Sequence, residues 1–249
     1  MQVRCTQCGA DIEVRADQRL LECPFCSSAL VVDAEGTLFD EVMLATVQPG
    51  EAPAHLRRFM AGRDTVADLD KDAVIGEPQL EYFPFWAFTV GAAGAEKAVL
   101  HPAAPSSLQG LHGMTLPAGT TQPMSHEAVG DAVVRDPEVP AATAREWLKT
   151  SVGDAPVRRT VLYHLPLYRL SYQWRGRTYQ AAVDGVSGKV FPADFPAKAE
   201  APYALVAVLA LVVFGLEGLV ISNLLLKAGV YLVSALPILG IAWLTTRRV

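Results

Sequence analysis

The C-terminal segment constrains the fold more than any other part of the sequence. The 44 residues from Tyr203 to Thr246 include only two charged side chains, those of Glu217 and Lys227. A helix rises about 1.5 Å per residue, so this length covers about twice the ~30 Å hydrocarbon core of a bilayer. The segment therefore predicts a C-terminal α-helical transmembrane hairpin. Its expected parts are a first helix at 203–222, a turn at 223–227 and a second helix at 228–244, all within an anchor at 201–249.

The charges that flank this segment predict its orientation. Lys198, Arg247 and Arg248 lie outside the two helices, whereas Lys227 alone lies in the turn. Cytoplasmic flanks of membrane helices carry the excess of lysine and arginine. Met1 is followed by polar residues and not by an apolar signal region, so we expect no secretory signal. The chain is expected in the cytoplasmic (inner) membrane as a two-helix, multi-pass protein with both termini in the cytoplasm.

All four cysteines lie within the first 26 residues, as two Cys-x-x-Cys pairs. Each pair can turn two thiolates toward one point, and two facing pairs complete a tetrahedral site. In a reducing compartment this usage favours a metal over disulfides. We predict one structural Zn²⁺ in a small β zinc ribbon at residues 1–36. The predicted ligands are Cys5, Cys8, Cys23 and Cys26.

The stretch between the two pairs has the pattern of a hairpin. Ile12 and Val14 alternate with charged residues, 16–18 is a turn candidate, and Leu20 and Leu21 lead back to the second pair. A third short strand is expected at 30–32. The ribbon is too short to fold without the metal, because it cannot bury enough apolar surface.

The charge of the ribbon argues against a nucleic-acid surface. Its arginines are outnumbered by its acidic residues, and the whole chain carries a formal charge of −5. A surface that follows phosphates needs a basic excess. We therefore favour protein docking, or a folding role for the metal alone. The charged residues compared are Arg4, Arg15 and Arg19 against Asp11, Glu13, Asp17 and Glu22.

Residues 37–200 are predicted to form a central α+β domain with an antiparallel sheet. The expected helices are 51–60, 125–134 and 141–149, and 101–123 reads as a loop because prolines and glycines interrupt it. Residues 80–90 and 162–172 resemble each other. Each copy has a leucine, a proline four residues later (Pro84 or Pro166) and an aromatic two residues after the proline. This internal echo is consistent with a duplicated, strand-centred half-domain, and the second copy continues as a three-stranded meander to Phe191.

The ribbon, the strand at 82–86 and the segment at 165–190 carry a resemblance to a known family. The chain resembles bacterial membrane proteins with an N-terminal TFIIB-type zinc ribbon, which are often labelled as relatives of the primosomal helicase. A helicase would need Walker motifs, and this sequence has none. In some bacteria such proteins are encoded near flotillin-like and phage-shock-protein-A-like proteins. The resemblance therefore implies a scaffold role in a membrane-remodelling or stress assembly, and it is compatible with a homo-oligomer.

No catalytic motif is recognisable in the sequence. None of the five histidines forms a metal-ligand pair, and every cysteine belongs to the ribbon. We therefore expect no enzyme. The first hypothesis is a membrane-anchored adaptor that binds protein partners. The alternatives are a membrane-tethered nucleic-acid-binding protein and a small transport or ion-path component that uses Glu217, although a carboxylate near the helix end and close to Lys227 more often has a structural role.

Overall fold

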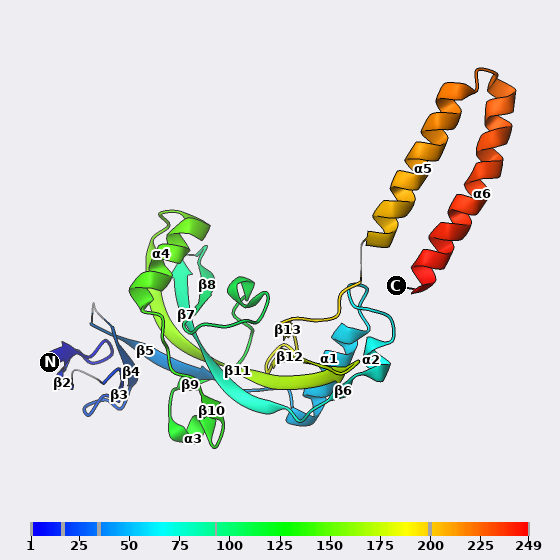
Figure 1. Ribbon diagram of the computed structural model, residues 1–249. Coiled ribbons are helices and arrows are strands. Elements are labelled where there is room, and N and C mark those ends of the chain that lie inside the picture. The colour runs from blue at the N-terminus through cyan, green and yellow to red at the C-terminus, as the bar shows by residue number, and fades with distance from the viewer. Residues whose placement is uncertain (1, 16–17, 34–35, 93, 199–200, 249) are drawn as a thin grey trace. The chain divides into compact units, whose positions relative to one another are not determined.

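The computed structural model describes residues 2–15, 18–33, 36–92, 94–198 and 201–248 (Figure 1). The chain divides into two compact units. The first unit contains residues 1–59 and 70–195, and the second contains 60–69 and 196–249.

The first unit is built on strands of very different lengths. They are β1 (Gln2–Arg4), β2 (Asp11–Glu13), β3 (Leu20–Glu22), β4 (Ala29–Asp33), β5 (Gly36–Met43), β6 (Val74–Ile75), β7 (Gln79–Val90), β8 (Lys97–Pro102), β9 (Thr121–Pro123), β10 (Val133–Val134), β11 (Val157–Trp174), β12 (Arg177–Asp184) and β13 (Val190–Pro192). The helices of this part of the chain are α1 (Ala52–Met60), α2 (Leu69–Asp72), α3 (His126–Val129) and α4 (Ala141–Val152), with short 3₁₀ turns at Pro49–Glu51 and Leu111–Gly113.

The large sheet is mixed rather than antiparallel as we expected. Its main order is β10-β7-β11-β5-β4-β3, and β1 and β2 form a separate two-stranded sheet. β5 is parallel to β11, and β10 is parallel to β7, whereas the other pairs are antiparallel. The predicted meander is confirmed, because β12 pairs with both β11 and β13 in antiparallel fashion. Parallel neighbours arise because β5 and β10 reach their partners through long connections rather than through hairpins.

The strand β7 is buried on both faces. Phe83 and Phe85 pack on one face against Leu165 and Leu167 of β11, where the segment that contains Leu111 covers them. Trp86, Phe88 and Val90 pack on the other face against the buried side of α4, formed by Ala144 and Leu148. Strands covered on both faces are apolar at almost every position instead of alternating. This is why residues 83–88 of the sequence form one unbroken apolar run.

The two copies of the sequence echo lie side by side at the centre of the sheet. Phe83 of β7 pairs with Leu165 of β11, and each of these residues precedes the proline of its copy. Pro84 lies opposite His164, and Pro166 lies opposite Tyr82. The antiparallel pairing is therefore symmetric about Phe83 and Leu165, so that a half-turn about this point exchanges the two strands.

The hairpins that extend the two central strands have the same register. In the first, Phe85 of β7 lies opposite Pro102 of β8. In the second, Leu167 lies opposite Asp184 of β12, and both residues come 82 positions later than their counterparts. The residue that follows each hairpin also makes the same hydrogen bond in the two halves. The amide of Ala103 donates to the carbonyl of Pro84 at 2.9 Å, and the amide of Gly185 donates to that of Pro166 at 2.7 Å.

The strands β5 and β10 show that the two halves exchange elements. β5 precedes β7 in sequence but pairs with β11, and β10 precedes β11 but pairs with β7. The loops that follow these strands are held in the same way. Trp86 Nε1 donates to the carbonyl of Val139 at 2.7 Å, and Tyr168 O–H donates to the carbonyl of Val47 at the same distance. The two acceptors are 92 residues apart.

The helices complete the structural repeat. Ala52, Leu56 and Met60 are buried in α1, and Ala141, Ala144 and Leu148 are buried in α4. Ala144 and Leu148 come 92 residues after Ala52 and Leu56. Each half is thus a strand, a helix, a long central strand and a hairpin strand. Equivalent residues of the two halves are 92 positions apart up to the helices and 82 positions apart from the long strands onward. The difference arises because the first half has ten more residues between its helix and its long strand, in the stretch that contains α2 and β6. We expect one cooperative unfolding unit, because each half supplies a strand to the other.

The predicted helix at 125–134 is wrong beyond its first turn. Ser125 caps α3 by accepting a hydrogen bond from the amide of Ala128 at 3.2 Å, as its position predicts. Gly130 then takes a φ of 57° and ends the helix. Val133 and Val134 join the edge of β7 as β10, because β-branched residues suit a strand and an open edge is available there.

The second unit contains two long helices, α5 (Ala201–Val220) and α6 (Leu224–Arg248). The chain reverses within residues 221–223, and α6 runs back along α5 (Figure 1). Asn223 caps α6 by accepting from the amides of Leu225 and Leu226. The turn is shorter than the predicted 223–227, because Asn223 starts the second helix at the next residue.

Leu224–Trp243 of α6 is long and apolar enough to cross a membrane, with a mean hydropathy of 2.0. Only 6% of its apolar window is buried, so it does not have the covered surface of a core helix in a soluble protein. The described apolar part of α5, Val206–Val220, is shorter. The two helices contact each other through Tyr231, whose hydroxyl donates to the carbonyl of Phe214 at 3.1 Å and whose ring packs edge-on against the Phe214 ring.

Two tyrosines of β11 test the exchanged arrangement. We expect Tyr168→Phe to lower the free energy of unfolding by about 1–3 kcal/mol, because it leaves the Val47 carbonyl without its donor in a buried place. Tyr172→Phe is the matched control: its hydroxyl is buried and has no hydrogen-bond partner among the described residues, so its removal is expected to be neutral or stabilising. Urea unfolding of the full chain in mild detergent, followed by tryptophan fluorescence, measures both. Equal losses for the two variants would contradict the assignment.

Candidate metal centre

The four cysteines lie in the turns of two separate hairpins. β1 pairs with β2, with Val3 opposite Ile12, and the chain between them contains Cys5 and Cys8. β3 pairs with β4, with Leu21 opposite Leu30, and the chain between them contains Cys23 and Cys26. The predicted hairpin between the Ile12 and Leu20 segments is therefore wrong: β2 and β3 each pair with a strand on the other side of their own cysteine turn. The turn predicted at 16–18 includes residues 16 and 17, which lie outside the described residues.

Each cysteine turn closes with the same backbone hydrogen bond. The amide of Gly9 donates to the carbonyl of Cys5, and the amide of Ser27 donates to that of Cys23, both at 2.9 Å. Gly9 has a φ of 75° and Ser27 has a φ of 55°. This left-handed conformation is free for glycine and costs about 1–2 kcal/mol for other residues. Ser27 therefore takes a strained conformation that lets the second turn match the first.

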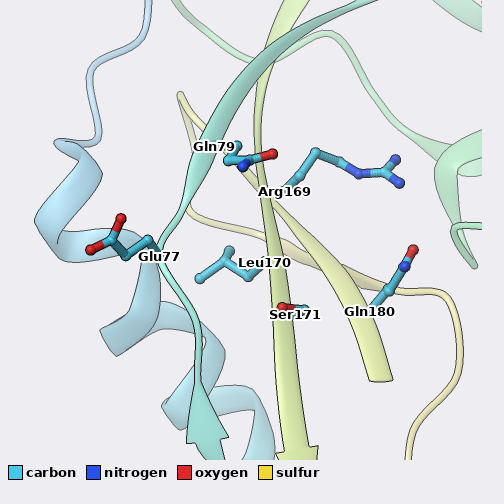
Figure 2. Close-up of a pocket in the computed structure, with 6 residues that line it drawn as sticks. All are labelled: Glu77, Gln79, Arg169, Leu170, Ser171 and Gln180. Carbon is cyan, nitrogen blue, oxygen red and sulfur yellow. The ribbon is translucent and has the colours of Figure 1, made fainter. Parts of the chain in front are cut away.

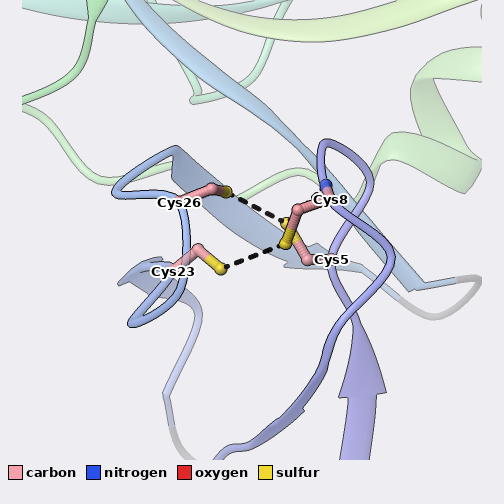
Figure 3. A group of neighbouring side chains, drawn as sticks. All are labelled: Cys5, Cys8, Cys23 and Cys26. Atoms are coloured by element: carbon pink, nitrogen blue, oxygen red, sulfur yellow. Dashed lines mark hydrogen bonds between the residues drawn. The ribbon is translucent and has the colours of Figure 1, made fainter.

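The four sulfur atoms form a compact cluster that can hold one metal ion. All four lie within 4.8 Å of one another. Figure 3 shows two of the contacts, Cys5 Sγ to Cys26 Sγ and Cys8 Sγ to Cys23 Sγ, and each is 3.8 Å long. Four sulfurs at about 2.3 Å from a central ion, in tetrahedral geometry, are about 3.8 Å from each other. Because all four positions come from the protein, such a site has no open place for water or a substrate.

The electrostatics of the cluster favour a bound cation. Hydrogen bonding with Ser28 lowers the pKa of the Cys26 thiol to about 6. For Cys8, the Ala10 amide lowers the thiol pKa, but desolvation and the neighbouring thiols outweigh it and raise the pKa to about 12. Several thiolates cannot share such a small volume without a positive charge between them. A divalent cation supplies that charge and holds all four ligands deprotonated.

The ribbon is joined to the large sheet by two threonines that no sequence motif singles out. Thr37 of β5 is buried; its hydroxyl accepts from the amide of Thr6 at 3.0 Å and donates to the carbonyl of Arg4 at 2.8 Å. The first cysteine turn is thereby fixed to β5. β4 also pairs with both β3 and β5, so the sheet continues across the predicted ribbon boundary at residue 36.

The ribbon and the sheet share apolar contacts as well. Cys5 and Cys23 are buried together with Ile12, Val14 and Leu30, and Phe39 of β5 packs against this group. Cys8 and Cys26 are exposed. A metal ion in this cluster would therefore stabilise the N-terminal edge of the sheet in addition to the ribbon.

A second polar pair lies inside the sheet. His164 of β11 and Asp40 of β5 are both almost completely buried, with Nε2 and Oδ1 3.0 Å apart. No sequence pattern indicates this contact, because the two residues are 124 positions apart. At the equivalent places in the other half stand Tyr82 and Ala132, so the repeat does not need a polar pair there. Neither Nε2 nor Oδ1 has a well-aligned hydrogen bond within the described part of the chain, so the pair is a close polar contact between β5 and β11.

The sequence favours a structural role for Glu217, either as a helix-end pair with Lys227 or with its side chain snorkelling to the interface. Lys227 Nζ donates to the carbonyl of Gly218 at 2.8 Å, which satisfies one of the open carbonyls near the end of α5. Glu217 is half-buried, and its Oε2 atom has no hydrogen-bond partner within the described part of the chain.

Comparison with known proteins adds no relative. No protein-family model, no curated protein and no solved structure matches this chain. The metal centre therefore follows from its own geometry: the structure brings together the four cysteines that the sequence predicted, at separations that suit one tetrahedral ion.

Metal binding is expected to release protons. The thiol of Cys8 has a pKa of about 12 in the metal-free protein, so it must lose its proton to become a ligand. The metal-bound state then binds fewer protons than the metal-free state, and the affinity for added Zn²⁺ should rise with pH and fall as the pH decreases from 7 to 5. Calorimetry in two buffers with different ionisation enthalpies, and competition with a chromophoric chelator, measure this.

The controls for this prediction are two neighbouring variants. Cys8→Ser should lower Zn²⁺ affinity by a large factor, about 100-fold or more, because it removes a ligand. Gln7→Ala changes an exposed residue of the same turn and should leave the affinity unchanged. Zinc affinity that is independent of pH, or equal in the two variants, would show that these thiols are not the ligands.

Proposed function

We propose that this chain is a membrane-anchored zinc-ribbon adaptor that holds protein partners at the cytoplasmic surface of a membrane. One observation carries the proposal: a closed four-cysteine site is built into the sheet of a chain that also contains a long, exposed, apolar helix. A closed site supports structure rather than chemistry, and the helix supplies a place in the bilayer.

Zinc is the metal that the site favours. A tetrahedral set of four thiolates suits Zn²⁺ or an iron centre. Paired Cys-x-x-Cys turns that close a tetrahedron without an open position are typical of structural zinc sites, and Zn²⁺ needs no redox partner. The role of zinc would be to hold the two cysteine hairpins together at the edge of the sheet.

Both helices of the second unit are proposed to cross the membrane as a hairpin. Leu211 and Leu219 of α5 and Leu232 of α6 each expose more than two thirds of their surface, as lipid-facing side chains do. A hairpin places Lys198 and Arg247 on the same side, and their positive charge favours the cytoplasm. Confinement to that surface raises the effective concentration of the sheet domain for partners at the membrane.

The partners are proposed to be proteins. The slightly acidic ribbon disfavours a polyanion as its ligand. The strands at the rim of the sheet offer backbone edges to which another chain can add. The resemblance drawn from the sequence implies flotillin-like or phage-shock-protein-A-like proteins as the class to examine first. Self-association of this chain is also compatible with an adaptor.

The membrane topology gives the first test of this proposal. The protein should stay in membranes after an alkaline carbonate wash, and a reporter fused after Val249 should report the cytoplasm. A reporter inserted between Ile221 and Asn223 should report the opposite side, because a hairpin places the turn across the bilayer. Reporters at the turn and at the end of the chain that lie on the same side would refute the two-helix anchor.

The adaptor role is tested by crosslinking in intact membranes followed by recovery of the full chain. We expect a protein partner whose recovery is lost when Cys23→Ser and Cys26→Ser are combined, because the ribbon no longer closes, and is kept in Gln7→Ala. Recovery of salt-sensitive nucleic acid without any protein would replace the adaptor with the nucleic-acid alternative. A membrane phenotype that Glu217→Gln abolishes without loss of folding would instead support the ion-path alternative.

A further inference from the structure

The strands β5 and β11 separate beside the ribbon. Their parallel pairing begins at Phe39 with Val161 and ends at Val42 with His164. Before Phe39, β5 continues beside β4, whereas β11 before Val161 continues beside β7. The two strands thus diverge, and a cleft of about 600 Å³ lies between them. Its walls are Leu38 and Phe39 on one side and residues 157–160 on the other, with Thr6 and Arg145 at its margin.

Three arginines line this cleft, and they come from two elements. Arg158 and Arg159 lie on β11, and Arg145 lies on α4. Arg159 is held in place, because its guanidinium is 2.7 Å from the carboxylate of Glu41 and lies over the ring of Phe39 at 5.3 Å. Three guanidinium groups and the carboxylate of Glu41 therefore line or adjoin the cleft. Guanidinium groups that are pre-positioned in this way suit carboxylates as partners.

A bulge directs two consecutive arginines into the same cleft. Neighbouring side chains of a regular strand point to opposite faces of the sheet. The register of β11 against β7 shifts between Val157 and Arg159, so Arg158 is the extra residue of a bulge. Bulges re-aim side chains in this way and are enriched next to binding sites.

The structural repeat provides an internal comparison for this position. Val157 lies opposite Val90, and 82 residues earlier Ile75 lies opposite Tyr172. The residues that correspond to Arg158 and Arg159 are therefore Gly76 and Glu77. There the chain is interrupted between β6 and β7, whereas β11 runs unbroken from Val157, and neither corresponding residue carries a positive charge.

A second, smaller cavity lies beside Glu77. It measures about 230 Å³ and is lined by Glu77, Gln79, residues 169–171 and Gln180; of these, Glu77 corresponds to Arg159 of the cleft. Figure 2 shows that the side chains of Glu77 and Arg169 point away from each other. The cleft beside the ribbon is wider than this cavity, and it is lined by three arginines and by Leu38, Phe39 and Val157.

We propose that the cleft between β5 and β11 binds an extended, acidic segment of a protein partner, which would lie along the open edge of β11. This inference rests on the proposed adaptor function and names the chemistry of its partner. Carboxylates would pair with Arg158, Arg159 and Arg145, and apolar side chains would contact Leu38 and Val157. An extended chain can also add backbone hydrogen bonds to an open strand edge. A phosphate polymer gains nothing from the apolar walls and is opposed by the acidic residues of the ribbon.

The test uses the zinc-loaded full chain in mild detergent and a fluorescein-labelled nine-residue peptide in which glutamate and valine alternate. We expect saturable binding in fluorescence anisotropy, and weaker binding at high salt. The double variant Arg158→Gly, Arg159→Glu places the residues of the other half in the cleft and should lower the affinity by about tenfold or more. The double variant Arg158→Gln, Arg159→Gln should also lower the affinity. It removes both positive charges without placing a second carboxylate beside Glu41. Glu77→Gln, in the other half, should change nothing.

Three results would overturn the proposal. The first is the absence of saturable peptide binding. The second is an unchanged peptide affinity in arginine variants that circular dichroism and zinc content show to be folded. The third is arginine-dependent binding of a 20-base-pair DNA duplex, or of phosphatidylglycerol vesicles, in preference to the peptide. The adaptor function is tested separately by the crosslinked partner. If that partner is recovered but the peptide does not bind, the cleft proposal fails and the adaptor stands. If the peptide binds through the arginines but no partner is recovered, the adaptor assignment fails and the cleft remains a peptide site.

Discussion

The antiparallel pairing of β7 with β11 is the constraint on which the rest of the first unit depends. Every element of the structural repeat attaches to one of these strands: β8 and β10 to β7, and β12 and β5 to β11. The pairing is symmetric about Phe83 and Leu165. Two equivalent loops are therefore held in the same way, one by a hydrogen bond from Trp86 and the other by a hydrogen bond from Tyr168. A slip of one residue would turn every side chain of a strand to the other face and would disrupt both faces of the core at once.

The ribbon is an addition to one half of this symmetric arrangement, and it makes the two halves different. β4 and the Thr6–Thr37 contact bring the cysteine cluster to the edge of β5. There β5 follows β4 and leaves β11, so a cleft opens between β5 and β11. The metal site and the arginine cleft are therefore neighbours for a structural reason. An ion that fixes the cysteine hairpins would also fix one wall of the cleft, which connects a structural metal to the proposed binding of a partner.

The second unit follows a different rule, because its helices expose their apolar side chains. In the sheet domain, large apolar side chains are mostly covered, whereas α5 and α6 expose leucines along much of their length. In water such a surface would drive aggregation, but in a bilayer it matches its surroundings. Two of the polar groups are satisfied locally, because Lys227 and Tyr231 each donate to a carbonyl of α5, whereas Glu217 Oε2 has no partner among the described residues. This local satisfaction is what a helix pair needs where water is absent.

The sequence by itself determined the features that depend on short-range spacing and on composition. The four cysteines, the apolar helices, the meander from β11 to β13 and the echo around Pro84 and Pro166 could all be read from neighbouring residues, because turn geometry and hydrophobic periodicity are local properties. Only the tertiary structure decided which strands pair. It placed β2 beside β1, sent β5 and β10 to the opposite halves, and brought Arg145 and Arg159 into a cleft with Leu38. These contacts join residues that are far apart in the chain, and they are chosen by the burial of both sheet faces together, which no local pattern specifies.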